Sequence, residues 1–314
     1  MRVTNSIIAS NTINGIQNNL ERLARSQEQI SANSRILRPS DNPNVLGQLF
    51  GVRNTLSYNE QYNQNIQDGL SFLDLADTSM ASVKKILDDA YEHAIDANNA
   101  DCAPEDRAAI AEQIDKLIDT VVDMANSTVG GRYIYAGTKN SRPPFSRNGD
   151  IIEYRGDLGE VTREVASATH HRVDVPGIGT DPANPGVFGV STAGPDPNGV
   201  YTVDEGIFKT LIDFKDSLLT DPFPGADSSI TAIQNETDNV LKHSVTAGAR
   251  YQHFEYLQKN LLNQEVNLTD TINDIEGANI PKLSIELGQH QLSYNSSLAV
   301  GSMIMQTSLL DFLR

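Results

Sequence analysis

The stretch ASNTINGIQNNLERLARSQEQISANSRILRPSDNP, residues 9–43, decides the fold of this chain. From Ala9 to Leu37, side chains recur at alternating steps of four and three residues, which places them on one seam of a helix, as in coiled coils. The seam comprises Ala9, Ile13, Ile16, Leu20, Leu23, Gln27, Ile30, Ser34 and Leu37. Because Gln27 and Ser34 interrupt the apolar seam, we expect the helix to need a partner.

A proline-containing segment separates this arm from the next helix. Pro39 disfavours helical backbone at Arg38. Ser40 to Asn42 are good N-caps, and Pro43 suits the first helical position. We therefore predict an N-terminal arm over residues 1–42 and a second, long helix that runs to about residue 98.

Two further seams predict helices of an ordinary intramolecular bundle. The second helix carries Ile66, Leu70, Leu73, Ala76, Met80, Val83, Leu87, Ala90, Ala94 and Ala97. A third helix begins at Pro104, ends at Gly130-Gly131, and carries Ile110, Ile114, Leu117, Val121 and Met124.

The amino-acid composition changes over residues 138–204, which are rich in Gly and Pro and contain short runs of β-branched residues. Asn148-Gly149 is typical of a hairpin turn that enters a strand. His171, Val173 and Val175 alternate with charged residues and indicate another short strand. This segment is predicted to be a small β insert.

Apolar residues at helical spacing return near residue 204, and a long helix is predicted from about residue 227 to 276. Pro281 would remove a helical hydrogen bond, so the sequence argues against one continuous C-terminal helix. The last arm carries Leu283, Leu287, Tyr294, Leu298, Met305, Leu309 and Phe312 among small residues that allow helices to approach closely.

Together these patterns predict a mainly α protein. Paired N- and C-terminal helices would form coiled-coil and long-helix-bundle segments, and a small β-rich domain would be inserted. The predicted parts are residues 1–42 with 280–314 as an assembly domain, 43–137 with 205–279 as the bundle, and 138–204 as an outer insert. The predicted assembly interface is Ile13, Ile16, Leu20, Leu23, Ile30, Leu37, Leu287, Tyr294, Leu298, Met305, Leu309 and Phe312.

Composition restricts the possible functions. A net charge of −17 argues against nucleic-acid binding, which needs basic patches. With 6% aromatic residues and no Trp, the chain suits long helices better than a compact enzyme core. The single cysteine excludes an intramolecular disulfide, and no apolar run is long enough for a secretory signal or a membrane span. These rules alone predict a soluble cytoplasmic protein.

Motifs of enzymes and metal sites are missing from the sequence, which predicts no catalytic activity, no cofactor and no metal. His170-His171 has no further ligand at suitable spacing, so a metal hydrolase is a distant alternative. Arg155-Gly156-Asp157 matches an adhesion tripeptide, although such a segment between strands is usually a turn. Asp88, Glu92 and Asp96 form an acidic helix face, which we interpret as solvated.

Several motifs resemble the flagellin superfamily and, within it, the hook-associated protein 3 family. They are MRVT at 1–4, QISANSRI at 29–36, RPSDNP at 38–43, GRYIYAGTK at 131–139 and SLLDFL at 308–313. The resemblance covers about residues 1–145 and 205–314. The runs at 38–43 and 131–139 favour the junction family over filament flagellin, which remains the nearest alternative.

The resemblance implies a structural subunit that polymerises at the hook–filament junction of the bacterial flagellum and templates filament assembly. The expected partners are further copies in a ring or helical layer, the preceding hook-associated protein, flagellin, and an export chaperone on the C-terminal arm. Neither nucleic acid nor membrane is expected as a partner. The resemblance also implies type III export without a cleaved signal peptide, hence an extracellular location, which overrides the expectation from composition.

Overall fold

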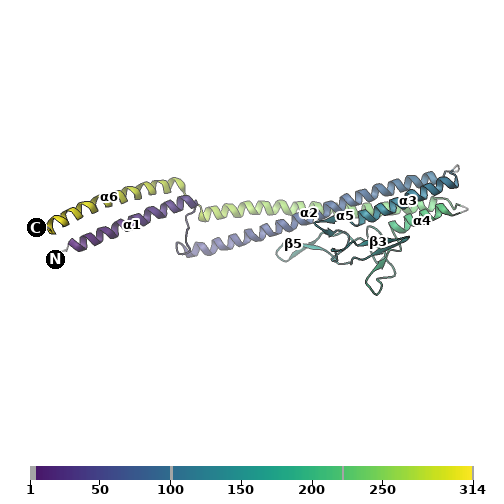
Figure 1. Cartoon of the computed structure of the whole chain (residues 1–314), viewed down its shortest axis with the longest axis horizontal. Helices are drawn as coiled ribbons and strands as arrows, with labels where there is room; N and C mark the ends of the chain where they lie inside the picture. The colour runs from purple at the N-terminus through teal and green to yellow at the C-terminus, as the bar shows by residue number, and fades with distance from the viewer. Residues whose placement is uncertain (1–4, 100–101, 221–222, 313–314) are drawn as a thin grey trace. The chain divides into compact units, whose positions relative to one another are not determined.

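The computed structural model describes residues 5–99, 102–220 and 223–312, and all side chains in these ranges except those of residues 5, 6, 8, 9 and 304–312. Its helices are α1 (Asn5–Ala32), α2 (Pro43–Ala97), α3 (Pro104–Ala125), α4 (Ile207–Leu219), α5 (Asp227–Glu276) and α6 (Ile280–Phe312). The mainly α fold with a small strand-containing part is confirmed (Figure 1).

Contacts divide the chain into two compact units. Unit 1 comprises residues 1–58 and 263–314, and unit 2 comprises residues 59–262. The helices α2 and α5 each contribute segments to both units. The three-part division predicted from the sequence, with boundaries after residues 42, 137, 204 and 279, stays a prediction.

The long helices of unit 2 enclose a continuous apolar core. The predicted seam of α2 is buried from Ile66 to Ala97, apart from Leu70, which is half-buried. The seam of α3 is rotated from the prediction, because its buried residues are Ala111, Ile114, Ile118, Val121 and Ala125. With alanine at both ends of this row, the larger Ile110 and Met124 lie at the edge of the core.

The helix α3 ends at Ala125 and not at the predicted Gly130-Gly131. The Asn126 side chain accepts a hydrogen bond from Phe145 N at 3.0 Å and donates one to Phe145 O at 2.9 Å. Both glycines have positive φ and form the turn between strands β1 (Thr128–Val129) and β2 (Arg132–Tyr133). The side chain of Asn126 thus attaches the end of α3 to the insert.

The insert consists of short antiparallel strands. β3 (Phe145–Asn148), β4 (Ile151–Tyr154) and β7 (Tyr201–Thr202) form one sheet in the order β3-β4-β7, and β5 (Thr162–Ala166) pairs with β6 (Thr169–Arg172). The predicted hairpin at Asn148-Gly149 is confirmed, since Asn148 pairs with Ile151. The predicted strand over His171, Val173 and Val175 is shorter in the structure: β6 ends at Arg172, and one further backbone hydrogen bond joins Val173 N to Val161 O at 2.9 Å.

A cluster of aromatic rings forms the core of the insert and joins it to α4. The ring centroids of Tyr135 and Phe188 lie 4.8 Å apart, and those of Phe145 and Phe188 lie 5.1 Å apart. Phe208 of α4 completes the cluster at 5.7 Å from Phe145. Edge and tilted contacts of this kind add to the stability gained by burial. This aromatic cluster therefore packs the insert against the helical bundle.

In unit 1, α1 ends at Ala32, so the predicted extension of its seam through Ser34 and Leu37 is wrong. Asn33 adopts the left-handed conformation, with φ of 48°, which ends the helix. The start of α2 at Pro43 is confirmed. The predicted break near Pro281 is also confirmed, because residues 277–279 separate α5 from α6.

Glu236 of α5 provides a pH test of the unit 2 core. Burial, with Glu205 as a lesser cause, raises the pKa of Glu236 from 4.5 to about 7. The folded state therefore holds this proton more tightly than the unfolded state, and the free energy of unfolding falls as pH rises from about 4.5 to 7. We expect Glu236→Gln to stabilise the protein by roughly 1–3 kcal/mol at pH 8.5 and by much less at pH 4.5. Denaturant unfolding at both pH values measures this, and an equal effect at both would contradict it.

Candidate assembly interface

The two terminal helices lie side by side in unit 1 with the chain termini at the same end (Figure 1). Asn19 Nδ2 donates a hydrogen bond to Ser297 Oγ at 2.7 Å. A Cβ atom placed on Gly301 would lie 3.1 Å from Ile16 Cδ1, so α6 approaches α1 closely at this glycine. The arms therefore form an antiparallel pair that depends on small residues of α6.

The face of α1 that is shielded from solvent differs from the predicted seam. Its shielded residues recur at steps of four and three and include Thr12, Ile16, Asn19, Leu23, Ser26 and Ile30. Ile16, Leu23 and Ile30 belong to the predicted interface, and each is partly buried. The other row on this face is polar. In the sequence, this row can be recognised as Thr, Asn and Ser at a spacing of seven.

The remaining row of the predicted seam lies on the outside of the pair. Ile13 is 52% exposed and Leu20 is 47% exposed, and Gln27 follows them at the same spacing. The heptad of α1 is thus divided into two apolar rows, of which the arm pair covers one. Ile13 and Leu20 therefore keep about half of their surface exposed.

The helix α6 shows the same division. Leu287 and Tyr294 are partly buried, as the predicted interface requires, and Leu298 is exposed. A further outer row, Ile285 and Leu292, was not predicted, and Leu292 is 69% exposed. The side chains of three predicted residues lie outside the described part of the chain, namely Met305, Leu309 and Phe312.

Unit 1 has almost no core of its own. Among its described side chains and glycines, the fully buried positions are Ser26, Leu49, Ile272 and Gly301. Helices gain most of their stability from tertiary packing of an apolar face. The pair formed by α1 and α6 covers only half of its apolar rows, so its hydrophobic core is incomplete.

A paired segment joins the arms to the start of α2. Arg35 N donates to Glu276 O at 2.7 Å, and Ser34 forms an antiparallel bridge with Gly277. Arg53 Nη2 lies 2.6 and 2.9 Å from the two carboxylate oxygens of Glu276. These contacts hold residues 34–35 and residues 276–277 side by side.

Asp41 organises the turn that contains the predicted interface residue Leu37. Its Oδ2 accepts hydrogen bonds from the backbone of Leu37 and Arg38, each at 3.1 Å, and its Oδ1 lies 2.7 Å from Arg25 Nη2 of α1. The hydrogen bond from Arg38, with Leu37 and Arg25, holds the pKa of Asp41 below its ordinary value. Sequence reasoning treated this residue only as a helix cap.

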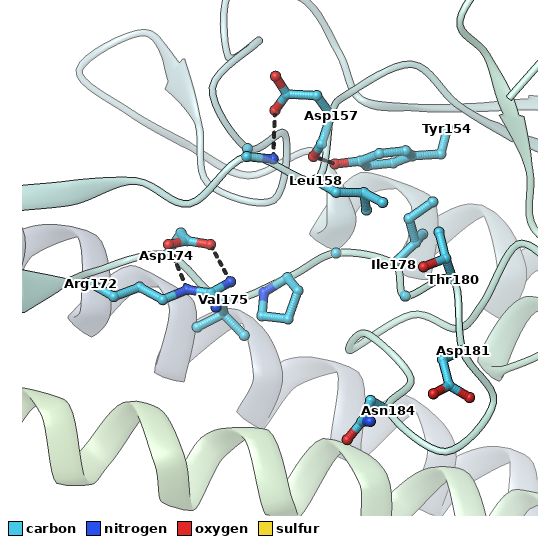
Figure 2. Close-up of a pocket in the computed structure, with 15 residues that line it drawn as sticks. Tyr154, Asp157, Leu158, Arg172, Asp174, Val175, Ile178, Thr180, Asp181 and Asn184 are labelled. Atoms are coloured by element: carbon cyan, nitrogen blue, oxygen red, sulfur yellow. Dashed lines mark hydrogen bonds and ion pairs between the residues drawn. The ribbon is translucent and has the colours of Figure 1, made fainter. Parts of the chain in front are cut away.

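The adhesion tripeptide has a structural role. Asp157 Oδ1 accepts hydrogen bonds from the backbone of Thr138 at 2.6 Å and Gly159 at 3.3 Å, and Arg155 pairs with Glu153. Asp157 and the ion pair of Arg172 and Asp174 line the same cavity, which has a volume of about 260 Å³ (Figure 2). Because its carboxylate is engaged within the loop, the tripeptide does not present the free acid that an adhesion motif needs.

The two histidines of the pair lie in different surroundings. His170 is exposed, whereas the ring of His171 lies 4.7 Å from that of His253. Burial, with His253 as a second cause, lowers the pKa of His171. Within the described residues, no cluster of three or more His, Cys, Asp or Glu side chains has the geometry to hold a metal ion. Nor does any described helix have the length and apolar character required to span a membrane.

Comparison with known proteins agrees with this picture. Residues 3–140 match the family model of the bacterial flagellin N-terminal helical region. Flagellar hook-associated protein 3 of Escherichia coli is 24% identical over 308 residues, which cover 94% of this chain and 96% of the relative. The chain is a homologue of flagellar hook-associated protein 3. Flagellin of Bacillus subtilis, at 21% identity over 96% of this chain and 95% of its own, is a more distant relative.

The fold of hook-associated protein 3 is also the fold of this chain. The crystal structure of Xanthomonas campestris FlgL aligns with a TM-score of 0.57 at 21% identity, over 71% of this chain and 99% of the other. The region that matches the family model of the bacterial flagellin N-terminal helical region, residues 3–140, includes α1, α2 and α3.

Asp41→Ala tests the turn at the base of the arms. Without the carboxylate, the amides of Leu37 and Arg38 lose their acceptor, and we expect their hydrogen exchange to accelerate about tenfold or more. The melting of unit 2 should stay unchanged, because Asp41 lies outside it. Asp270→Ala, which removes an exposed carboxylate of α5 in unit 1, is the control. Equal exchange rates in Asp41→Ala and the unmodified chain would contradict this role.

Proposed function

We propose that the chain is a structural subunit of the bacterial flagellum that polymerises at the hook–filament junction and templates the filament. One observation carries the proposal: the terminal helices pair through a half-polar face and leave a second apolar row, with Leu20 and Leu292, exposed to solvent. Neighbouring copies would cover this row. The assembly interface is then Ile13 and Leu20 of α1 with the outer residues of α6, supported by the inner row.

The magnitudes agree with arms that need neighbours. Burying one Leu or Ile contributes about 1.5–3 kcal/mol, whereas ordering each residue costs roughly 1–2 kcal/mol in backbone entropy. A helix pair with one large apolar residue in four or five, half of them exposed, gains little net stability alone. Contacts in a polymer would supply the missing burial.

The distribution of charge supports side-by-side packing through unit 1. That unit holds 8 Lys and Arg against 9 Asp and Glu, a net charge of −1, whereas unit 2 holds 16 against 32, a net charge of −16. Copies of a strongly acidic chain repel one another. A nearly neutral terminal unit allows close packing where the apolar rows lie.

The proposed partners follow from this role. The chain would form a ring or helical layer between the preceding hook-associated protein and flagellin, with no enzymatic activity. An export chaperone would cover the C-terminal arm before type III export, and the apolar row of α6 offers the surface that such a protein needs. The assembled subunit would be extracellular.

The nearest alternative is filament flagellin itself. The runs RPSDNP at 38–43 and GRYIYAGTK at 131–139 support the junction role. Deletion of the gene distinguishes the two. Loss of a junction subunit should release flagellin monomers into the medium from cells with intact hooks, whereas loss of flagellin removes the filament without such release.

Leu20→Asp tests the outer row directly. In an assembled layer, the carboxylate would be buried without a partner at a cost of several kcal/mol per contact. In the monomer, Leu20 is exposed, so thermal stability should hardly change. We expect the variant to be exported but cells to lose swarming and leak flagellin, as measured by a motility assay and a blot of the supernatant. Gln17→Asp, also exposed on α1, is the control and should swim. Normal swimming of Leu20→Asp cells would refute the proposal.

Limited proteolysis of the soluble monomer tests the lack of a core in unit 1. Cleavage is expected first near residues 33–42 and 277–281, because helices without a buried core open readily. A stable fragment should retain unit 2, residues 59–262. Mass spectrometry of the products identifies the sites. Full protection of both arms in a verified monomer would show that the pair is stable without neighbours.

A further inference from the structure

A partly enclosed cavity opens in the insert where the hairpin of β5 and β6 stops pairing. The last backbone hydrogen bond between the segments that flank this hairpin runs from Val173 N to Val161 O at 2.9 Å. Beyond that bond the two segments separate, and residues 157–159 of one and 174–178 of the other line the cavity of about 260 Å³ (Figure 2). All of these residues belong to unit 2. The insert therefore builds this cavity from its own fold.

One wall of the cavity contains backbone amides without a partner. Val175, Gly177 and Ile178 line the cavity, and all three residues are buried. Within the described residues, the backbone amides of these three donate no hydrogen bond to another group of the chain. Buried amides in native proteins are almost always paired with protein, water or a ligand. Because the three residues line the cavity, its occupant is the partner available to these amides.

Exposed side chains of the cavity add groups that can donate and accept hydrogen bonds. Thr180 and Asn184 line the cavity, and in the part of the chain that the structure describes neither side chain has a hydrogen-bond partner. Asp181 accepts a hydrogen bond from Ala183 N at 2.9 Å through Oδ1, which leaves Oδ2 for an occupant. Leu158, which is 43% exposed, adds apolar surface. The lining thus combines donors, acceptors and an apolar patch.

The charges around the cavity favour a neutral occupant. Among the described residues that line it, three are acids, namely Asp157, Asp174 and Asp181, and one is a cation, Arg172. Arg172 is already paired with Asp174 at 2.8 Å and with Glu160 at 2.6 Å. An anion would meet carboxylates that no free cation compensates, and a cation would leave the buried amides without an acceptor.

We propose that this cavity binds a neutral sugar of a single ring, a role that goes beyond the proposed function and does not depend on it. Each sugar hydroxyl can both accept and donate a hydrogen bond, so one ring can serve the buried amides and also Asp181 Oδ2. The C–H groups of the ring would pack on Leu158. Cavities for drug-sized ligands have volumes of about 300–1,000 Å³, so about 260 Å³ agrees with a smaller ligand.

An NMR titration of the isotope-labelled, full-length monomer tests the proposal. A ligand of this size at ordinary ligand efficiency binds with a Kd on the order of 1 mM. We expect at least one of glucose, galactose, mannose and N-acetylglucosamine to shift the amide resonances of Val175, Gly177 and Ile178 saturably. N-acetylneuraminic acid should bind at least about tenfold more weakly, because its carboxylate would face the acids of the cavity. If no neutral sugar shifts these amides at up to about fifty times that Kd, or if the acidic sugar binds equally well, the proposal is wrong.

Two substitutions in the cavity lining test where the sugar lies. Thr180→Val with Asn184→Ala removes a hydroxyl and an amide that the described chain leaves without partners, and we expect the Kd of the sugar to rise about tenfold or more. Thr202→Val with Asn148→Ala changes an exposed threonine and asparagine elsewhere on the insert, and the Kd should stay unchanged. Amide spectra of both variants check that the fold is retained. An unchanged Kd in the first variant, or an equal rise in the control, would overturn the assignment of the cavity.

Discussion

The structure of unit 1 depends on which face of α1 packs against α6. α1 turns Ile16 and Leu23, together with polar and small neighbours, toward α6 and keeps Leu20 outside. The close approach at Gly301 and the hydrogen bond between Asn19 and Ser297 fix this choice, because both need small or polar residues at the contact. The monomer therefore covers the polar row and one apolar row of α1, and it leaves the other apolar row, with Ile13 and Leu20, exposed. Assembly is the process that would complete the packing.

Contacts within unit 1 connect this incomplete pair to the adjoining ends of the long helices. The arms are attached to α2 and α5 by Asp41, by Arg53 and by the bridge between Ser34 and Gly277. Unit 2 has a continuous core and carries nearly all of the negative charge. A well-packed acidic unit and a nearly neutral unit with few buried residues suit a subunit that packs through its terminal helices in a polymer.

The sequence predicted most of the fold because helical seams and their breaks are local signals. The burial of α2, the hairpin at Asn148-Gly149 and the break before Pro281 all follow from residue spacing and turn chemistry. The orientation of α1 could not be predicted, because the sequence shows where the apolar stripe lies but not which of its rows another helix covers. The polar row at Thr12, Asn19 and Ser26 was the available clue. Similarly, the early end of α3 results from the long-range attachment of Asn126 to Phe145, which no local pattern reveals.

Solvent access to the outer row, measured before and after assembly, tests the central claim most directly. In a Cys102→Ser chain, Leu20→Cys places a thiol on the outer row and Leu23→Cys places one on the inner row. Maleimide should label position 20 readily in the monomer and at least about tenfold more slowly in isolated flagella, whereas position 23 should be labelled more slowly than position 20 in the monomer and slowly in flagella. Equal labelling of position 20 in monomer and flagella would show that neighbouring subunits do not cover this row, and the account would be wrong.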